Sequence, residues 1–171
     1  MRSVGAIAGP TLLAAAVVGG LGTASSATAT DDGALNGTYL ATSNGEWAQT
    51  NDSYHDEATV RSTWTITSTC TTPQDCAGRV TSDAGWSADL RRSNVEWTVK
   101  RDIPNWEPCA DGTAYTGAQV YRFYSADASG GQTSLGSTTL IGEDKTTGPS
   151  GACGRNQWLT VRMPFKLVKI A

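Results

Sequence analysis

Residues 59–70 read TVRSTWTITSTC and hold the clearest structural pattern in the chain. Taken in steps of two, Val60, Trp64, Ile66 and Cys70 fall on one face, while threonines and an arginine occupy the other. A side-chain period of two, filled with β-branched and aromatic residues, is typical of a strand with one buried face. The stretch therefore predicts a β-strand, and its terminal cysteine suggests that one end of the sheet is pinned covalently.

The same alternation continues along the chain and predicts an all-β fold. A hairpin is predicted for residues 86–91 and 95–100, and no capped helical period follows residue 29. Seven or eight short strands predict a single antiparallel β-barrel or sandwich, and pairing between sequence neighbours favours the barrel. Other predicted strands are 38–42, 78–82, 118–125, 137–141 and 159–167, with Pro164 indicating an edge or a bulge, and predicted loops are 47–57, 103–112 and 146–151.

The chain contains four cysteines, an even number that predicts two disulfides in an exported protein. Four cysteines allow three connectivities, of which we favour Cys70–Cys76 with Cys109–Cys153. Residues 71–75 look like a turn that would bring the first pair within bonding reach. The C-x5-C spacing does not match a zinc ribbon, and the single histidine lies far from it, so we expect no metal and no cofactor.

The N-terminus has the pattern of a secretory signal peptide. Arg2 is followed by an apolar run and by an A-x-A site at residues 27–29. We therefore expect residues 1–29 to be a signal peptide and residues 30–171 to be one all-β extracytoplasmic domain, secreted or at the cell envelope, with no membrane span after cleavage. An uncleaved single-span anchor is the alternative, which Pro10 and several glycines disfavour.

The charge balance limits the partners. The chain has 13 basic and 16 acidic side chains and a formal net charge of −3. Nucleic acid and anionic membrane surfaces attract basic proteins, so this mild acidity argues against both.

Six tryptophans provide the candidate binding residues. Trp64 and Trp97 lie on apolar strand faces and are predicted to be core. The other four fall in predicted loops or at strand starts, where an indole can stack on a sugar or cap an apolar pocket. The alternative is that they fill the ends of a small barrel. The predicted ligand-binding residues are Trp47, Trp86, Trp106 and Trp158.

Paired carboxylates suggest a second possible activity. A glycosidase needs two carboxyl groups on either side of a sugar site. We expect the candidate pairs to be solvated loop charges, so no catalytic residue is assigned. The pairs are Asp56 with Glu57, Glu107 with Asp111, and Glu143 with Asp144.

Four segments together show a family resemblance: residues 42–48 (TSNGEWA), 60–66 (VRSTWTI), 104–109 (PNWEPC) and 142–148 (GEDKTTG). They resemble a group of small secreted proteins from mycobacteria and related actinobacteria, over nearly all of the mature chain. The resemblance implies export and a cell-envelope or extracellular setting. That group has no assigned activity, so the resemblance implies no site residues.

The leading hypothesis is a secreted, non-catalytic all-β domain that binds a lipid, a glycan or a protein partner at the cell envelope. The alternatives are a small extracellular hydrolase that uses loop carboxylates and a purely structural protein-contact domain. The sequence leaves the ligand and the oligomeric state open.

Overall fold

The computed structural model describes residues 33–127, 129–132 and 136–171. The predicted signal peptide lies outside these residues. Within them the chain forms ten strands and two short 3-10 helices. In chain order these are β1 Gly37–Ser43, η1 Gly45–Trp47, β2 Gln49–Thr50, β3 Ser53–Tyr54, β4 Val60–Thr72, β5 Asp75–Ser82, β6 Trp86–Ser93, β7 Glu96–Pro108, β8 Ala114–Ser125, β9 Thr139–Thr147, η2 Ala152–Gly154 and β10 Thr160–Lys169.

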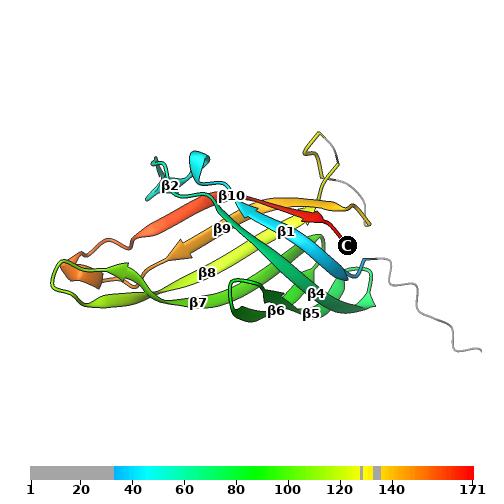
Figure 1. The fold of residues 1–171 in the computed structure, drawn as a ribbon, viewed down its shortest axis with the longest axis horizontal. Coiled ribbons are helices and arrows are strands. Elements are labelled where there is room, and N and C mark those ends of the chain that lie inside the picture. The colour runs from blue at the N-terminus through cyan, green and yellow to red at the C-terminus, as the bar shows by residue number, and fades with distance from the viewer. Residues whose placement is uncertain (1–32, 128, 133–135) are drawn as a thin grey trace, which may run out of the picture.

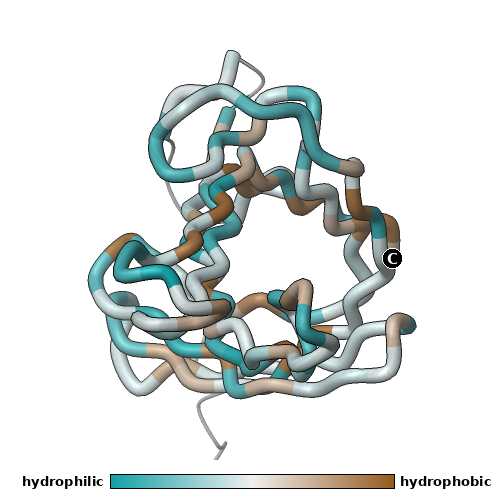
Figure 2. Tube along the Cα trace, turned by 90° about the vertical axis from the view of Figure 1, so that its left-hand side faces the viewer, coloured by the Kyte–Doolittle hydropathy of each residue, from teal (hydrophilic) through white to brown (hydrophobic). Residues whose placement is uncertain are grey.

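Eight of the strands close into an antiparallel barrel. From β4 to β10 each strand pairs with the next in sequence, and β1 pairs with both β4 and β10. Tyr39 on β1, for example, lies opposite Trp64 on one side and Lys169 on the other. Viewed from the end that is on the left in Figure 1, the chain traces a closed ring (Figure 2). The all-β prediction is confirmed, and the barrel is the correct alternative.

The segment between β1 and β4 leaves the barrel and lies outside it. There η1, β2 and β3 form a small excursion beside β10 (Figure 1). The strand β2 pairs with β10, with Gln49 opposite Arg162, and then with β3. The loop predicted for residues 47–57 is correct for the turn at Asn51 and Asp52 but misses β2 and β3, because two-residue strands are too short to show a period in sequence.

Pro164 lies inside β10, where a central strand would normally need its N–H. The Pro164 carbonyl accepts a hydrogen bond from the Asn44 N–H at 2.8 Å. The N–H and C=O of one residue point to the same side of a strand. The position at which Pro164 lacks an N–H therefore faces Asn44 as well. Here β1 has just ended at Ser43 and β2 begins only at Gln49. Pro164 thus occupies a local edge, as its position in the sequence indicated.

The predicted loop at residues 103–112 is largely wrong, because β7 continues to Pro108. The β7–β8 register shifts between Ile103 and Glu107, and Asn105 has a φ of 55°. This irregularity is a bulge, which accommodates Pro104 without a ladder hydrogen bond. Likewise β9 spans Thr139–Thr147, so it begins later and runs further than the strand predicted at 137–141.

The barrel interior is filled around Trp64, which is 1% exposed. Its ring lies 4.9 Å from that of Tyr121 and 5.2 Å from that of Phe165, measured between ring centroids. Gly142 faces both Phe123 and Phe165 across the strands, and a Cβ there would approach the Arg122 carbonyl at 1.9 Å. The buried core comprises Leu35, Tyr39, Ala41, Trp64, Ile66, Cys76, Val80, Ala88, Leu90, Trp97, Val99, Tyr121, Phe123, Leu140, Phe165 and Leu167.

Two disulfides hold opposite ends of the barrel, and both favoured pairings are confirmed. Cys70 and Cys76 bridge β4 and β5 next to their turn. Cys109, after the end of β7, is bonded to Cys153 in η2 and thereby ties the β7–β8 hairpin to the β9–β10 connection. In the part of the chain that the structure describes, no helix has the length and apolar character needed to cross a bilayer.

Candidate functional site

A chain of hydrogen bonds crosses the barrel interior near the end that carries the Cys109–Cys153 disulfide. The Ser43 hydroxyl donates to Asp144 Oδ2 at 2.7 Å, and the Gln119 amide donates to Asp144 Oδ1 at 2.8 Å. Arg101 Nε donates to Gln119 Oε1 at 2.6 Å. The four side chains come from β1, β9, β8 and β7, so the network joins half of the barrel wall.

Burial controls the ionisation of this network. It raises the pKa of Asp144 above its ordinary 3.8, although the hydrogen bonds from Ser43 and Gln119 and the Arg101 charge act in the opposite direction. Burial also raises the pKa of Tyr121 above its ordinary value of 10.0, and the nearby Asp144 charge adds to this effect. Both groups therefore resist carrying negative charge inside the barrel.

Trp86 belongs to this interior group. The Arg101 guanidinium lies 4.4 Å from the centroid of the Trp86 ring, a cation–π contact. The Trp86 ring also stacks on Tyr121, with centroids 6.3 Å apart and an interplanar angle of 11°. Trp86 is thus half-buried among side chains of the barrel, where it helps to fill one end.

Trp106 lies further towards the same end, as part of β7 rather than in a loop. A Cβ added to Gly117 would come within 2.7 Å of its ring, so the indole packs against a position that lacks a side chain. Its neighbour Glu107 is 3% exposed, and the Oε2 atom has no hydrogen-bond partner among the described residues. Trp106 and Glu107 therefore contribute to packing beneath the β7–β8 hairpin.

Trp47 and Trp158, in contrast, point away from the barrel interior and are 68% and 58% exposed. Each lines a hollow on the outer wall, along β10. Trp158 borders a hollow of about 380 Å³ together with Asn156, Gln157 and Lys145. Trp47 borders a second hollow of about 220 Å³ with Gln49 and Glu143. Arg162 lines both hollows, so they adjoin along β10; together they are called the outer groove here, with Trp158 bordering one hollow and Trp47 the other.

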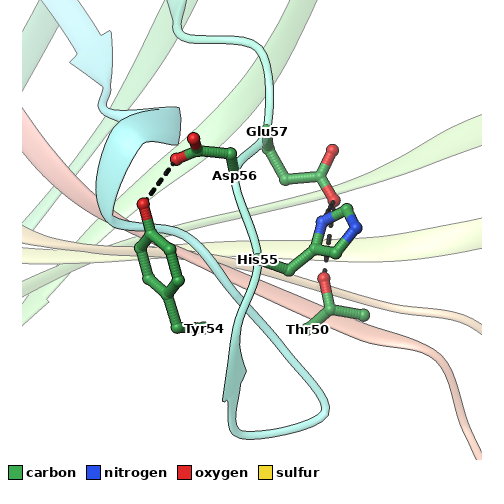
Figure 3. Close-up of polar contacts among 5 residues, drawn as sticks. All are labelled: Thr50, Tyr54, His55, Asp56 and Glu57. Atoms are coloured by element: carbon green, nitrogen blue, oxygen red, sulfur yellow. Dashed lines mark hydrogen bonds and ion pairs between the residues drawn. The ribbon is translucent and has the colours of Figure 1, made fainter.

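The excursion that carries Trp47 is fastened by its own polar contacts (Figure 3). Tyr54 donates a hydrogen bond to Asp56 at 2.7 Å, and Thr50 donates to Glu57 at 3.4 Å. His55 Nδ1 lies 3.1 Å from the same Glu57 oxygen. The Tyr54 hydroxyl also lies 3.1 Å from the Glu46 carbonyl, next to Trp47. These contacts hold η1 and β2 in place beside β10.

Arg162, at the middle of the groove, is neutralised by two carboxylates. Its Nε lies 3.1 Å from Glu143 Oε2, and its Nη2 lies 3.7 Å from Asp52 Oδ1. Apart from Trp158, the side chains around the first hollow are amides, a hydroxyl and charged groups, while the second hollow adds Met163 and Pro164. The groove is thus largely polar and bordered by aromatic rings.

In two of the predicted carboxylate pairs the members do not face a common site. Glu143 faces outward to Arg162, whereas Asp144 is buried in the interior network, so the two lie on opposite faces of the wall. Glu107 is buried, whereas Asp111 is exposed and accepts hydrogen bonds from Thr113. The expectation that these pairs are all solvated loop charges is wrong for Asp144 and Glu107.

The four predicted tryptophans therefore divide into two pairs. Trp86 and Trp106 pack at one end of the barrel, and Trp47 and Trp158 border the outer groove. Sequence reasoning missed Arg162, the residue common to both hollows, and the buried Asp144–Gln119 pair. If the strand predicted at residues 137–141 had been extended further, the alternation of Leu140, Gly142 and Asp144 would have placed Asp144 on the inner face. Among the described residues, no three histidine, cysteine, aspartate or glutamate side chains are grouped to hold a metal ion.

Comparisons with known proteins give a likeness of fold. No protein-family model matches the chain, and no curated protein matches it. A similar solved structure is the monomer form of the Mycobacterium tuberculosis PknI sensor domain, with a TM-score of 0.56 and 14% sequence identity. The similarity covers 81% of this chain and 88% of that one. At 14% identity, this similarity shows that the two proteins share a fold architecture.

Proposed function

We propose that the protein is a non-catalytic binding domain and that it holds a glycan in the outer groove between Trp47 and Trp158. The observation that supports this most directly is the pair of exposed indoles that border two adjoining, largely polar hollows. An exposed tryptophan forfeits apolar burial unless a ligand covers it. Sugars offer a flat apolar face for stacking and hydroxyls around the edge.

The polar residues between the indoles suit those hydroxyls. Asn156, Gln157 and Gln49 present both donors and acceptors. A small number of polar groups placed between aromatic surfaces is the usual way in which a site fixes the orientation of its ligand.

The strand β10 forms the floor and sets the length of the site. Trp158 lies four residues before Arg162, and Trp47 lies two residues before Gln49, which pairs with Arg162. Trp47 shares its hollow with Pro164, and Trp158 lies just before the start of β10 at Thr160. The part of β10 from Thr160 to Pro164 spans about 13 Å at about 3.3 Å per residue, which leaves room for more than one sugar.

Lipid binding inside the barrel is less well supported than glycan binding in the outer groove. At the level of Trp64 the barrel is occupied by packed aromatic rings, including Tyr121, Phe123 and Phe165. Interiors packed in this way leave little room for an acyl chain. The two disulfides are typical of exported proteins, and the fold shared with a sensor domain is compatible with a binding role.

The test is a titration of the oxidised protein, followed by tryptophan fluorescence. The probes are hexasaccharides with different linkages: cellohexaose, xylohexaose, mannohexaose, maltohexaose and hexagalacturonate. We expect saturable quenching by at least one of them. Trp47→Ala and Trp158→Ala should each weaken its binding by about fivefold or more, since truncating an aromatic anchor costs over about 1 kcal/mol.

Tyr115→Ala is the matched control, because Tyr115 is an exposed aromatic residue outside the groove. It should bind the same sugar as the wild type does. The proposal fails if none of the probes causes a saturable change, or if binding persists unchanged in both groove variants.

A further inference from the structure

A third hollow extends the groove along the outer wall. It has a volume of about 500 Å³ and shares Gly142 and Pro164 with the hollow beside Trp47. The three hollows therefore follow one another along β10, starting at Trp158. The third differs from the first two because its lining is more apolar and contains Arg61 and Lys166.

The register places these two cations on either side of one residue. Arg61 on β4 pairs with Thr42 on β1, and Thr42 pairs with Lys166 on β10. The row continues through Ile141 on β9 to Tyr124 on β8. Residues of one row point to the same face, and two strand spacings separate the backbones of Arg61 and Lys166 by about 10 Å.

Acidic side chains on β7 and β9 have partners of their own. Glu143 is paired with Arg162 at 3.1 Å, and Glu96 is paired with Arg122 at 3.8 Å. Among the described residues, neither Arg61 nor Lys166 forms an ion pair. In a chain of net charge −3, two cations without counterions border the same hollow.

Like charges on two side chains that border the same hollow repel each other, and an anion placed between them relieves the repulsion. The apolar surface of Ile141, Tyr124 and Pro164 beside them strengthens an electrostatic contact, because it displaces water. The long side chains of Arg61 and Lys166 can both reach a group held over Thr42.

We infer that the glycan is anionic and that its carboxylate or phosphate group binds over Thr42, between Arg61 and Lys166. The inference rests on the proposed function, because it takes this hollow as the continuation of the glycan groove. A single polymer chain fits the geometry better than a membrane does. A flat anionic surface would also meet the exposed carboxylates of Glu46 and Asp56, which lie on the excursion beside the groove.

The experiment compares each acidic glycan with its neutral counterpart. The probes are hexagalacturonate, hexaguluronate and a hyaluronan hexasaccharide, each with its carboxyl-reduced form, and a phosphomannan with its dephosphorylated form. At low salt the wild type should bind at least one acidic member about tenfold more tightly than the neutral partner, and added salt should reduce the difference.

The double variant R61Q/K166Q should lose this preference while it still binds the neutral partner as the wild type does. The matched control is R91Q/K100Q, which removes the same charge from another hollow, on the outer face of β6 and β7. It should keep the preference.

The outcomes separate the two proposals. Equal binding of acidic and neutral glycans that depends on Trp47 and Trp158 overturns the anionic subsite and leaves the glycan groove intact. Acid-dependent binding that is lost in R61Q/K166Q but unchanged in both tryptophan variants overturns the glycan groove instead. Binding to phosphatidylglycerol vesicles that needs Arg61 and Lys166, with no acidic glycan preferred, replaces the glycan by a membrane and overturns the inference.

Discussion

The Ser43 hydroxyl donates a hydrogen bond of 2.7 Å to the Asp144 carboxylate, although the two residues are 101 positions apart in sequence. Ser43 ends β1 and Asp144 lies in β9, with β10 between them in the barrel wall. The hydrogen bond therefore links β1, which closes the barrel, to β9, the strand on the far side of its direct neighbour β10. Both Asp144 oxygens accept hydrogen bonds, the second from Gln119 at 2.8 Å.

The burial of Asp144 predicts a definite pH dependence of stability. Burial raises the pKa of this carboxyl above 3.8, so the folded protein keeps the proton at pH values where the unfolded chain has released it. Its contribution to the free energy of unfolding is therefore largest below pH 3.8 and falls as the pH rises through the raised pKa. Urea unfolding of the wild type and Asp144→Asn should show a stability difference, wild type minus variant, that declines with rising pH.

A second variant tests whether the pKa of Asp144 is responsible for this pH dependence. The Ser43 hydrogen bond lowers the pKa of Asp144, so Ser43→Ala should raise the pKa further, as measured by NMR titration of the Asp144 carboxyl carbon. Ser87→Ala, an exposed serine on β6, should leave that titration unchanged. A stability difference that stays constant with pH would contradict the prediction.

Trp64 should account for more stability than any exposed tryptophan. Its ring is 1% exposed, packs against four other aromatic rings and donates a hydrogen bond to Ser62 at 3.0 Å. Trp64→Ala should lower the free energy of unfolding by about 3–5 kcal/mol, because it leaves a large cavity. Trp47→Ala should change it by no more than about 0.5 kcal/mol, because that ring is already in water. If urea unfolding showed similar losses of stability in Trp64→Ala and Trp47→Ala, the packing of Trp64 at the centre of the core would be contradicted.

The two disulfides should contribute unequally. Cys109 and Cys153 are separated by 44 residues, whereas Cys70 and Cys76 are separated by 6. The chain-entropy model gives about 4 kcal/mol for the longer loop and about 2 kcal/mol for the shorter one. C109S/C153S should therefore be less stable than C70S/C76S in urea unfolding. The reverse order would mean that effects other than loop closure dominate.

The sequence determined the strands and their faces wherever polar and apolar residues alternate. In β4, β6 and the first half of β7 the period of two identified the buried side correctly, and Trp64 and Trp97 are each 1% exposed. This succeeds because side-chain direction in a strand is a local property, fixed by the residue's own position. The Cys70–Cys76 pairing was accessible for the same reason, since one turn brings both cysteines together.

The alternation failed where the inward residues are small or polar. In β9 the interior positions after Leu140 are Gly142, Asp144 and Thr146, so no apolar repeat marks them. Glu143 and Asp144 therefore read as one acidic loop, although they lie on opposite sides of the wall. Similarly, Pro104 and Pro108 indicated a loop, because a bulge in β7 cannot be recognised without its partner strand.

Only the tertiary structure decided which tryptophans share a surface. In sequence Trp47 and Trp158 are 111 positions apart, yet both border a groove on β10, while Trp106 packs inward on β7. That division depends on β1 and β2 reaching β10, pairings between residues more than 100 positions apart. Local patterns specify how each strand faces, but the partners of distant strands are chosen by the packing and hydrogen bonding of the closed barrel as a whole.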